Sequence, residues 1–82
     1  MIEWRDDLSR WRQIVTIIKR RIESGEYPPG RMLTECAFME EFGVAEVTAR
    51  KAFAGLRERG LVYTRHALRS FVGPELEEEW RS

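Results

Sequence analysis

The sequence predicts a mainly α-helical domain with three helices and a small β-hairpin at its C-terminal end. Apolar residues recur with a helical period in three successive segments, and turns that contain Gly or Pro separate these segments. After Gly60 the pattern changes to two short β-rich stretches, which is typical of a hairpin. With 82 residues, 43% of them hydrophobic, the chain has apolar material for one domain with one small core.

The first helix is predicted within residues 8–24. Its apolar residues follow i, i+3, i+4 spacing along one face: Leu8, Trp11, Ile14, Val15, Ile18 and Ile22. Ser24 and Gly25 supply a stop signal. The next five residues, "EYPPG", form a rigid turn, because two prolines fix φ and Gly30 permits a reversal. A short strand is expected at residues 31–33.

The second and third helices are predicted at residues 35–42 and 45–59. Thr34 is the expected N-cap of the second helix, and the helix dipole favours Glu35 in its first turn. Gly43 ends that helix, and the turn "GVA" leads into the third one. The apolar residues of the third helix lie close to a 3.6-residue period: Val44, Ala49, Ala52, Phe53 and Leu56. Gly60 stands where a left-handed residue belongs after a helix.

Residues 61–73 are predicted to form the hairpin. "LVYTR" and "RSFVG" are its expected strands, and "HAL" connects them. We therefore expect one domain at residues 1–73. Residues 74–82, "PELEEEWRS", are expected to be an acidic tail or a linker.

The charges of the chain are balanced in number but unevenly distributed. Fourteen basic and fourteen acidic residues give a net charge of zero, whereas nucleic-acid-binding domains are usually basic. Residues 44–72, however, hold six cations and two anions, while residues 73–82 hold four anions and one cation. This local basic segment can steer a polyanion even when the net charge is zero.

Several classes of protein are not expected. No run of 18 apolar residues indicates a membrane span, and the N-terminus lacks the apolar stretch of a signal peptide. The single Cys36 rules out an internal disulfide and a Cys-based metal cluster, so a reduced, cytoplasmic location is expected. Paired carboxylates, a nucleophile–base set and a phosphate loop are not visible, and the only histidine is His66. We therefore expect neither an enzyme nor a cofactor or metal.

The order of the predicted elements is that of a winged helix-turn-helix. Four segments carry a closer resemblance: "RQIVTIIKRRIESGEYPPGRML", "EEFGV", "TARKAFAGLRERGLV" and "SFV". Together they resemble the DNA-binding domain of GntR-type bacterial transcription regulators over residues 11–72. The resemblance implies that the third helix reads DNA, with contacts at Thr48 and Arg50.

The sequence departs from the GntR pattern near the expected DNA surface. "MLTE" lacks the proline of the usual Leu-Pro-Ser-Glu, and Ala45 replaces the usual Ser or Thr cap of the third helix. Glu46 stands where an Arg is usual. Cys36 also stands where an Arg is common, and a small buried or half-buried thiol is expected there. In the wing, Ala67 and Arg69 replace two glycines.

Ten residues are candidates for DNA contact: Thr34, Glu35, Glu46, Val47, Thr48, Arg50, Lys51, Arg65, His66 and Arg69. Arg50 suits a guanine or a phosphate, with a solvated side chain or an internal salt bridge as the alternative. Cations of the wing suit phosphates or a minor groove, with a merely solvated hairpin as the alternative.

Glu46 leaves three interpretations open. A carboxylate near a helix N-terminus is stabilised by roughly 0.3–1 kcal/mol, so it can partly replace the missing cap at Ala45. It can instead accept a hydrogen bond from the N4 amino group of cytosine and so change the sequence preference. In the third interpretation, the helix binds DNA poorly.

The sequence therefore predicts a sequence-specific DNA-binding domain of a transcription regulator, with helix 45–59 in the major groove and wing 61–73 on the backbone or minor groove. The expected partners are double-stranded operator DNA of two-fold symmetry and a second copy of the chain, in a homodimer. The effector domain that usually follows in this family is missing. The chain is therefore either a piece of a longer protein or a small stand-alone regulator. The alternative function is a winged-helix protein–protein interaction module, which the zero net charge, Glu46, the acidic tail and the lost glycines favour.

Overall fold

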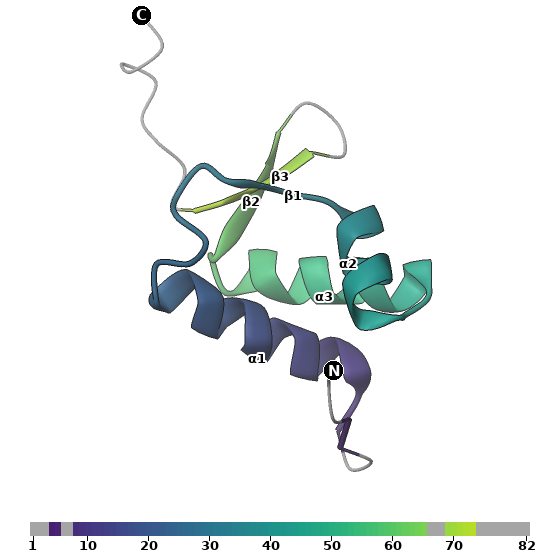
Figure 1. Ribbon diagram of the computed structural model, residues 1–82. Helices are drawn as coiled ribbons and strands as arrows, with labels where there is room; N and C mark the ends of the chain where they lie inside the picture. Colours follow the sequence, from purple (N-terminus) through teal and green to yellow (C-terminus); the bar gives the residue numbers. More distant parts are fainter. Residues whose placement is uncertain (1–3, 6–7, 66–68, 74–82) are drawn as a thin grey trace, which may run out of the picture.

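The computed structural model describes residues 4–5, 8–65 and 69–73. Its elements are α1 (Arg10–Glu23), β1 (Met32–Leu33), α2 (Glu35–Phe42), α3 (Glu46–Glu58), β2 (Val62–Arg65) and β3 (Arg69–Val72). Figure 1 shows the strands above α1 and α3, with α2 at one end. The predicted fold class, a winged helix-turn-helix of three helices plus a wing, is confirmed. Within the described ranges no helix is both long and apolar enough to cross a membrane.

Helix α1 begins two residues later than the apolar period suggests. Ser9 has an extended backbone and occupies the N-cap position, so Leu8 precedes the helix and is 38% exposed. The Gln13 side chain ties this preceding segment to the helix, since its amide nitrogen donates to the backbone oxygens of Arg5 and Leu8. On the inner face, Ile14 and its neighbours Val15 and Ile18 are buried.

The turn between α2 and α3 follows from one glycine. Helix α2 has the predicted bounds, and the Thr34 hydroxyl caps it by accepting a hydrogen bond from the Ala37 amide at 3.1 Å. Gly43 then adopts a left-handed conformation with φ of 62°, which reverses the chain. Ala45 is extended and begins α3 without a side-chain cap. The two helices are therefore joined by only three residues.

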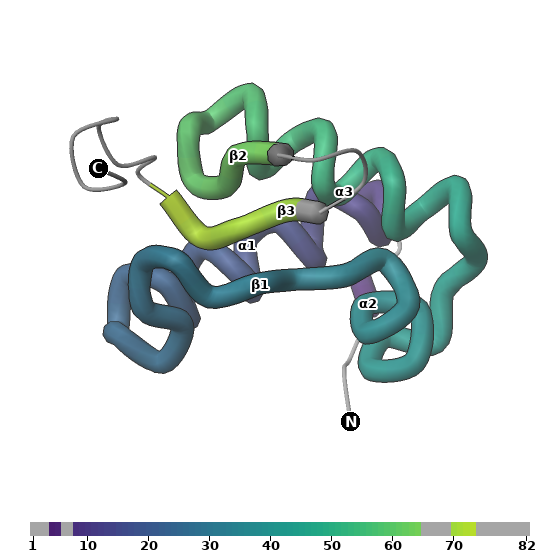
Figure 2. The backbone as a smooth tube through the Cα atoms, turned by 90° about the horizontal axis from the view of Figure 1, so that it is seen from above, coloured from purple at the N-terminus to yellow at the C-terminus, as the bar shows by residue number. Residues whose placement is uncertain are grey.

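The sheet has the order β1-β3-β2, so β3 pairs antiparallel with both other strands. Figure 2 shows β3 running between β1 and β2. Backbone hydrogen bonds extend the β1 pairing, because the Gly30 amide donates to Val72 and the Val72 amide donates to Arg31, each at 2.8 Å. This pairing connects the segment before α2 to the wing and fixes the base of the wing.

The core holds α3 against α1 and α2. Its largest fully buried side chains are Phe53, Ile14, Ile18, Leu56 and Val72. The Phe53 ring stacks on Phe38 of α2 with a centroid distance of 4.4 Å. On the α1 side, an added Cβ at Gly55 would lie 2.9 Å from the Trp11 ring, so only glycine allows this close approach of the two helices. Trp4 also packs against the core.

An ion pair connects the C-terminal end of α1 to α2. Arg21 contacts the Glu41 carboxylate and donates to the Tyr27 hydroxyl at 2.8 Å. The hydrogen bond to Glu41 is the main reason that the pKa of Arg21 is raised above its usual value. The Arg21 guanidinium also lies over the rings of Tyr27 and Phe42. These contacts support the fold, because they hold the C-terminal end of α1 against α2.

Candidate nucleic-acid interface

Helix α3 presents a continuous exposed stripe along its whole length. The exposed residues recur at helical spacing: Glu46, Val47, Arg50, Lys51, Ala54, Arg57 and Glu58. Val47 is 60% exposed, which leaves its apolar side chain free to contact a partner. Thr48 is half-buried at the same end. The first two turns of α3 thus combine a carboxylate, an apolar group and two cations on one surface, and the outward positions of Glu46, Val47 and Arg50 are those that the sequence predicts.

Arg50 lies between two carboxylates. Its Nη2 atom is 3.0 Å from the Glu46 carboxylate one turn earlier, and its Nε atom is 3.9 Å from the carboxylate of Glu35 on α2. The side chains of Glu46 and Arg50 are each 60% exposed. Exposed pairs of this i,i+4 type are worth only about 0.3–0.5 kcal/mol. Of the alternatives for Arg50, the internal salt bridge is therefore present, but it is weak enough to exchange for other partners.

The start of α2 lies beside the first turn of α3. The Thr34 hydroxyl is engaged as the N-cap, and the Glu35 side chain reaches Arg50. Cys36, in contrast, is exposed, so the expectation of a buried or half-buried thiol is wrong. The physical reason is the helical phase, because α2 turns Phe38 and Phe42 toward the core and Cys36 away from it. The thiol is therefore a surface group beside the candidate site.

A groove of about 340 Å³ separates α3 from the wing. Its lining consists of Glu35, Arg50, Arg57, Thr64 and Ser70. The Arg57 guanidinium donates to the Thr64 hydroxyl at 3.4 Å, and the Thr64 and Ser70 hydroxyls are 3.3 Å apart. The sequence analysis overlooked Arg57, although it follows Arg50 by seven residues, which is two helical turns. That spacing is the signal that places both cations along the same face.

The wing carries the remaining candidates. Arg65 and Arg69 are directly paired across β2 and β3, so both lie at the tip end of the hairpin. Their side chains lie outside what the structure describes. His66, together with Ala67 and Leu68, falls outside the described residues altogether. Below the tip, Tyr63 stacks on Phe71 with a centroid distance of 5.6 Å, which stiffens the two strands.

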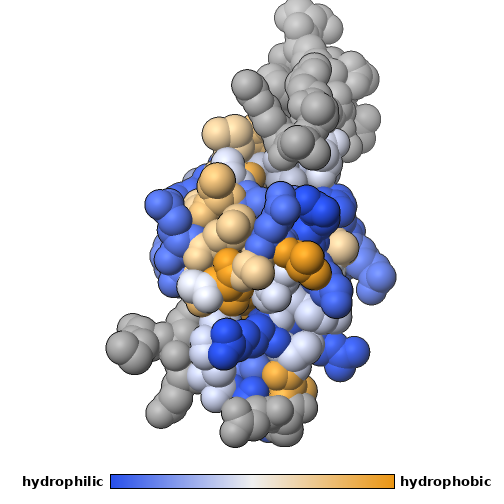
Figure 3. All heavy atoms as spheres, turned by 90° about the vertical axis from the view of Figure 1, so that its right-hand side faces the viewer, coloured by the Kyte–Doolittle hydropathy of each residue, from blue (hydrophilic) through white to orange (hydrophobic). Residues whose placement is uncertain are grey.

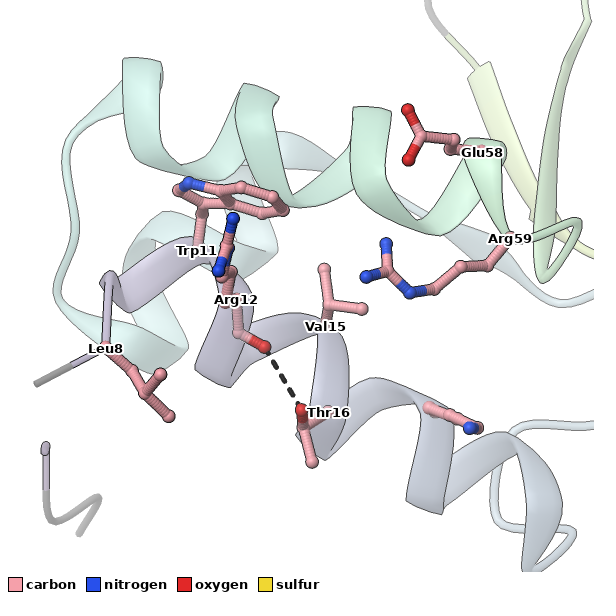
Figure 4. A pocket seen from close by; sticks show the side chains of 8 residues that line it. Leu8, Trp11, Arg12, Val15, Thr16, Glu58 and Arg59 are labelled. Carbon is pink, nitrogen blue, oxygen red and sulfur yellow. Dashed lines mark hydrogen bonds between the residues drawn. The ribbon is translucent and has the colours of Figure 1, made fainter.

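A second groove, of about 450 Å³, lies between α1 and α3 and shares no residue with the first. Figure 4 shows Trp11 and Val15 of α1 facing Arg59 at the end of α3, with Arg12 and Thr16 on the α1 rim. Arg59 donates to the Gly55 carbonyl at 3.0 Å, and the Arg12 guanidinium lies over the Trp11 ring. The candidates whose side chains the structure describes do not line this groove.

Figure 3 looks onto the end of the molecule where α2 meets the start of α3. Hydrophilic side chains surround separate apolar ones on this face. Val47 and Met32 are among the exposed large apolar side chains of the described residues. Such a mixture suits a partner that offers both charge and apolar groups, as the edges of DNA bases do.

Comparisons with known proteins identify the family. Residues 11–72 match the model of the bacterial regulatory proteins of the gntR family. The transcriptional regulator RB1450 of Rhizobium meliloti is 40% identical over 63 residues, which are 76% of this chain and 26% of that protein. The repressor MngR of Escherichia coli, named for mannosyl-D-glycerate transport and metabolism, is 38% identical over 66 residues, 79% of this chain and 28% of the repressor. The chain thus spans about a quarter of the length of these relatives.

The arrangement of the elements is also found in a solved complex. The DNA-binding domain of AraR, in complex with operator ORX1, superposes with a TM-score of 0.76 and 29% identity. The superposition covers 89% of this chain and 95% of that one. The gntR model matches residues 11–72, which are well over half of this chain. This chain therefore belongs to the gntR family of bacterial regulatory proteins.

Proposed function

We propose that this chain binds operator DNA as the winged helix-turn-helix domain of a transcriptional repressor. The observation that carries the proposal is the exposed face of the first two turns of α3, which bears Val47, Arg50 and Lys51 shortly after the Gly43 turn. A helix that enters the major groove presents its N-terminal residues to the base edges. The likeness to an operator-bound AraR domain supports this placement.

The candidate residues divide into three roles, which are contact with base edges, contact with the DNA backbone or minor groove, and the positioning of another side chain. Residues 46, 47 and 50 contact base edges, and the Val47 side chain suits the methyl group of a thymine. Thr34, Thr48 and Lys51 contact phosphates around the groove, as do the cations of the wing, Arg65 and Arg69. His66 reaches the backbone or the minor groove from the wing, and Glu35 positions Arg50.

A second copy of the chain completes the proposed complex. One domain offers only about four phosphate cations, which are Lys51, Arg65, Arg69 and, in the groove between α3 and the wing, Arg57, so a single copy should bind weakly at physiological salt. A homodimer on a two-fold symmetric operator would place two α3 helices in successive major grooves, about 34–36 Å apart. Such a repressor would act in the cytoplasm, where the operator is.

The alternative, a protein–protein interaction module with weak or no DNA binding, makes a different prediction. Its support is the zero net charge and the exposed Val47. The likeness to an operator-bound domain counts against it. The strength of duplex binding at low salt separates the two functions.

The test is fluorescence anisotropy with labelled duplexes between about 50 and 200 mM salt. Four phosphate contacts per copy predict a slope of log K against log salt of about −3 to −4 for one bound copy and about −7 for a dimer. Lys51→Gln should make this slope shallower by about 0.9. Lys19→Gln is the matched control, because Lys19 is an exposed lysine of α1 that lines only the second groove. If no duplex binds at about 50 mM salt, the DNA-binding proposal is wrong.

A further inference from the structure

The ion pair between Glu46 and Arg50 places a hydrogen-bond acceptor beside several donors on the exposed first turn of α3. The two side chains are 3.0 Å apart, and neither is buried. A carboxylate only accepts hydrogen bonds, whereas a guanidinium only donates them. The pair therefore forms one surface with donors on one side and an acceptor on the other.

The major-groove edge of a G·C base pair has the complementary arrangement. Guanine offers two acceptors, N7 and O6, and the cytosine next to it offers the N4 amino group as a donor. We propose that Glu46 and Arg50 together read one G·C base pair, with Arg50 donating to the guanine and Glu46 accepting from the cytosine. This inference rests on the proposed DNA-binding function and adds the base pair that the site selects.

The same arrangement rejects an A·T pair at that position. Adenine places an N6 donor where guanine has O6, and thymine places an O4 acceptor where cytosine has its donor. Arg50 would then face a donor, and the Glu46 carboxylate would face an acceptor. Glu46 thus acts as a specificity-determining residue, since Arg50 alone still finds the N7 acceptor of either purine.

One feature of the structure reduces the cost of bringing a carboxylate to a polyanion. Arg50 already pairs with Glu46 in the free protein, so the repulsion between this carboxylate and the DNA phosphates is reduced. Glu35 lies 3.9 Å from the Nε atom of Arg50 and helps to orient the guanidinium, but as a second carboxylate it does not lower this cost. Glu35 is therefore a positioning residue for the pair, and it also lines the groove between α3 and the wing.

The decisive experiment is selection of duplexes from a random pool at about 50 mM salt with the wild-type chain and with Glu46→Gln. The wild type should select G·C at one position. The amide introduced by the substitution carries both an acceptor and a donor, so preference for G·C over A·T at that position should fall by about 5-fold or more. Preferences at other positions should stay unchanged. Glu58→Gln is the matched control, because it removes the same charge from an exposed residue in the last turn of α3.

The outcomes separate the inference from the proposed function. Suppose that Glu46→Gln and Glu58→Gln both raise the affinity for all duplexes by the same factor and keep the same preferred sequence. Glu46 then acts only through its negative charge, so the inference is overturned while the DNA-binding proposal stands. The inference is also overturned if the wild type binds duplexes but selects no G·C pair at any position. If the wild type binds no duplex, the proposed function itself fails. Thermal melting of each variant checks that the exposed substitution leaves the fold intact.

A second measurement needs no protein variant. In the selected duplex, 7-deazaguanine replaces the guanine of the G·C pair and removes the N7 acceptor, so the wild type should bind about 5-fold or more weakly. Inosine at the same position is the control, because it lacks only the minor-groove amino group of guanine. Equal binding to all three duplexes would contradict a contact from Arg50 to this base.

Discussion

Arg57 provides a test of the groove between α3 and the wing. Its guanidinium lines the groove and donates to Thr64 at 3.4 Å, near the long limit of a hydrogen bond. An exposed contact of this length should add less than about 0.5 kcal/mol to the free energy of unfolding. Arg57→Gln should therefore leave stability nearly unchanged and affect DNA binding, because the groove loses a cation that faces the phosphates.

The magnitude follows from the release of counterions. One lost phosphate contact makes the slope of log K against log salt shallower by about 0.9. When the salt concentration rises from about 50 to 200 mM, the affinity of both proteins for DNA falls. The factor by which it falls should be about 3- to 4-fold smaller for Arg57→Gln than for the wild type. Anisotropy titrations over this range measure it. Arg20→Gln is the control, because Arg20 is an exposed cation of α1 that lines neither groove.

Three results would refute this reasoning. An unchanged slope in Arg57→Gln would mean that Arg57 does not meet a phosphate. A change of the preferred base at a single position would mean that Arg57 reads a base edge instead. Equal slopes for Arg57→Gln and Arg20→Gln, both reduced, would point to a diffuse charge effect with no contribution from the groove.

Two further predictions concern stability, measured by urea unfolding followed by circular dichroism. Ala45→Ser should raise the free energy of unfolding by about 1 kcal/mol, because Ala45 already has the extended N-cap backbone and lacks a cap oxygen; no gain would contradict this. Gly55→Ala should lower it by about 1 kcal/mol, because its Cβ would lie 2.9 Å from Trp11 and 3.0 Å from Val15, and this overpacking outweighs the gain in helix propensity. A more stable Gly55→Ala variant would show that α1 moves aside easily.

Local sequence signals were sufficient for most of the fold. The bounds of α2 were predictable because Thr34 and Gly43 mark its two ends with a cap and a left-handed turn. The start of α1 was not, since the apolar period includes Leu8 while the backbone becomes helical only after Ser9. Local patterns could not predict the pairing of β1 with β3 either. A two-residue strand is defined by its hydrogen-bonded partner, and the partner of β1 lies about forty residues away in the sequence.

The candidate site was only partly predictable for a similar reason. Helical spacing predicts that Glu46 and Arg50 share a face, because they are one turn apart. It cannot predict that Glu35 of α2 approaches Arg50, since that contact depends on the angle set by the Gly43 turn. Thr64 and Ser70 join the groove through the register of β2 and β3, which turn patterns did not determine. Contacts within an element were therefore accessible, whereas contacts between elements needed the fold.

The two parts of the proposed interface are attached to the domain in different ways, which separates their effects on binding. The first turn of α3 is held through its buried face, where Ala49, Ala52 and Phe53 pack into the core. Base-reading side chains on this turn therefore start from a fixed helix, and changes there should alter sequence preference. The wing is held at its base by β1 and carries its cations toward the tip. Because phosphates are the same in every sequence, changes in the wing should alter affinity and its salt dependence equally for all duplexes.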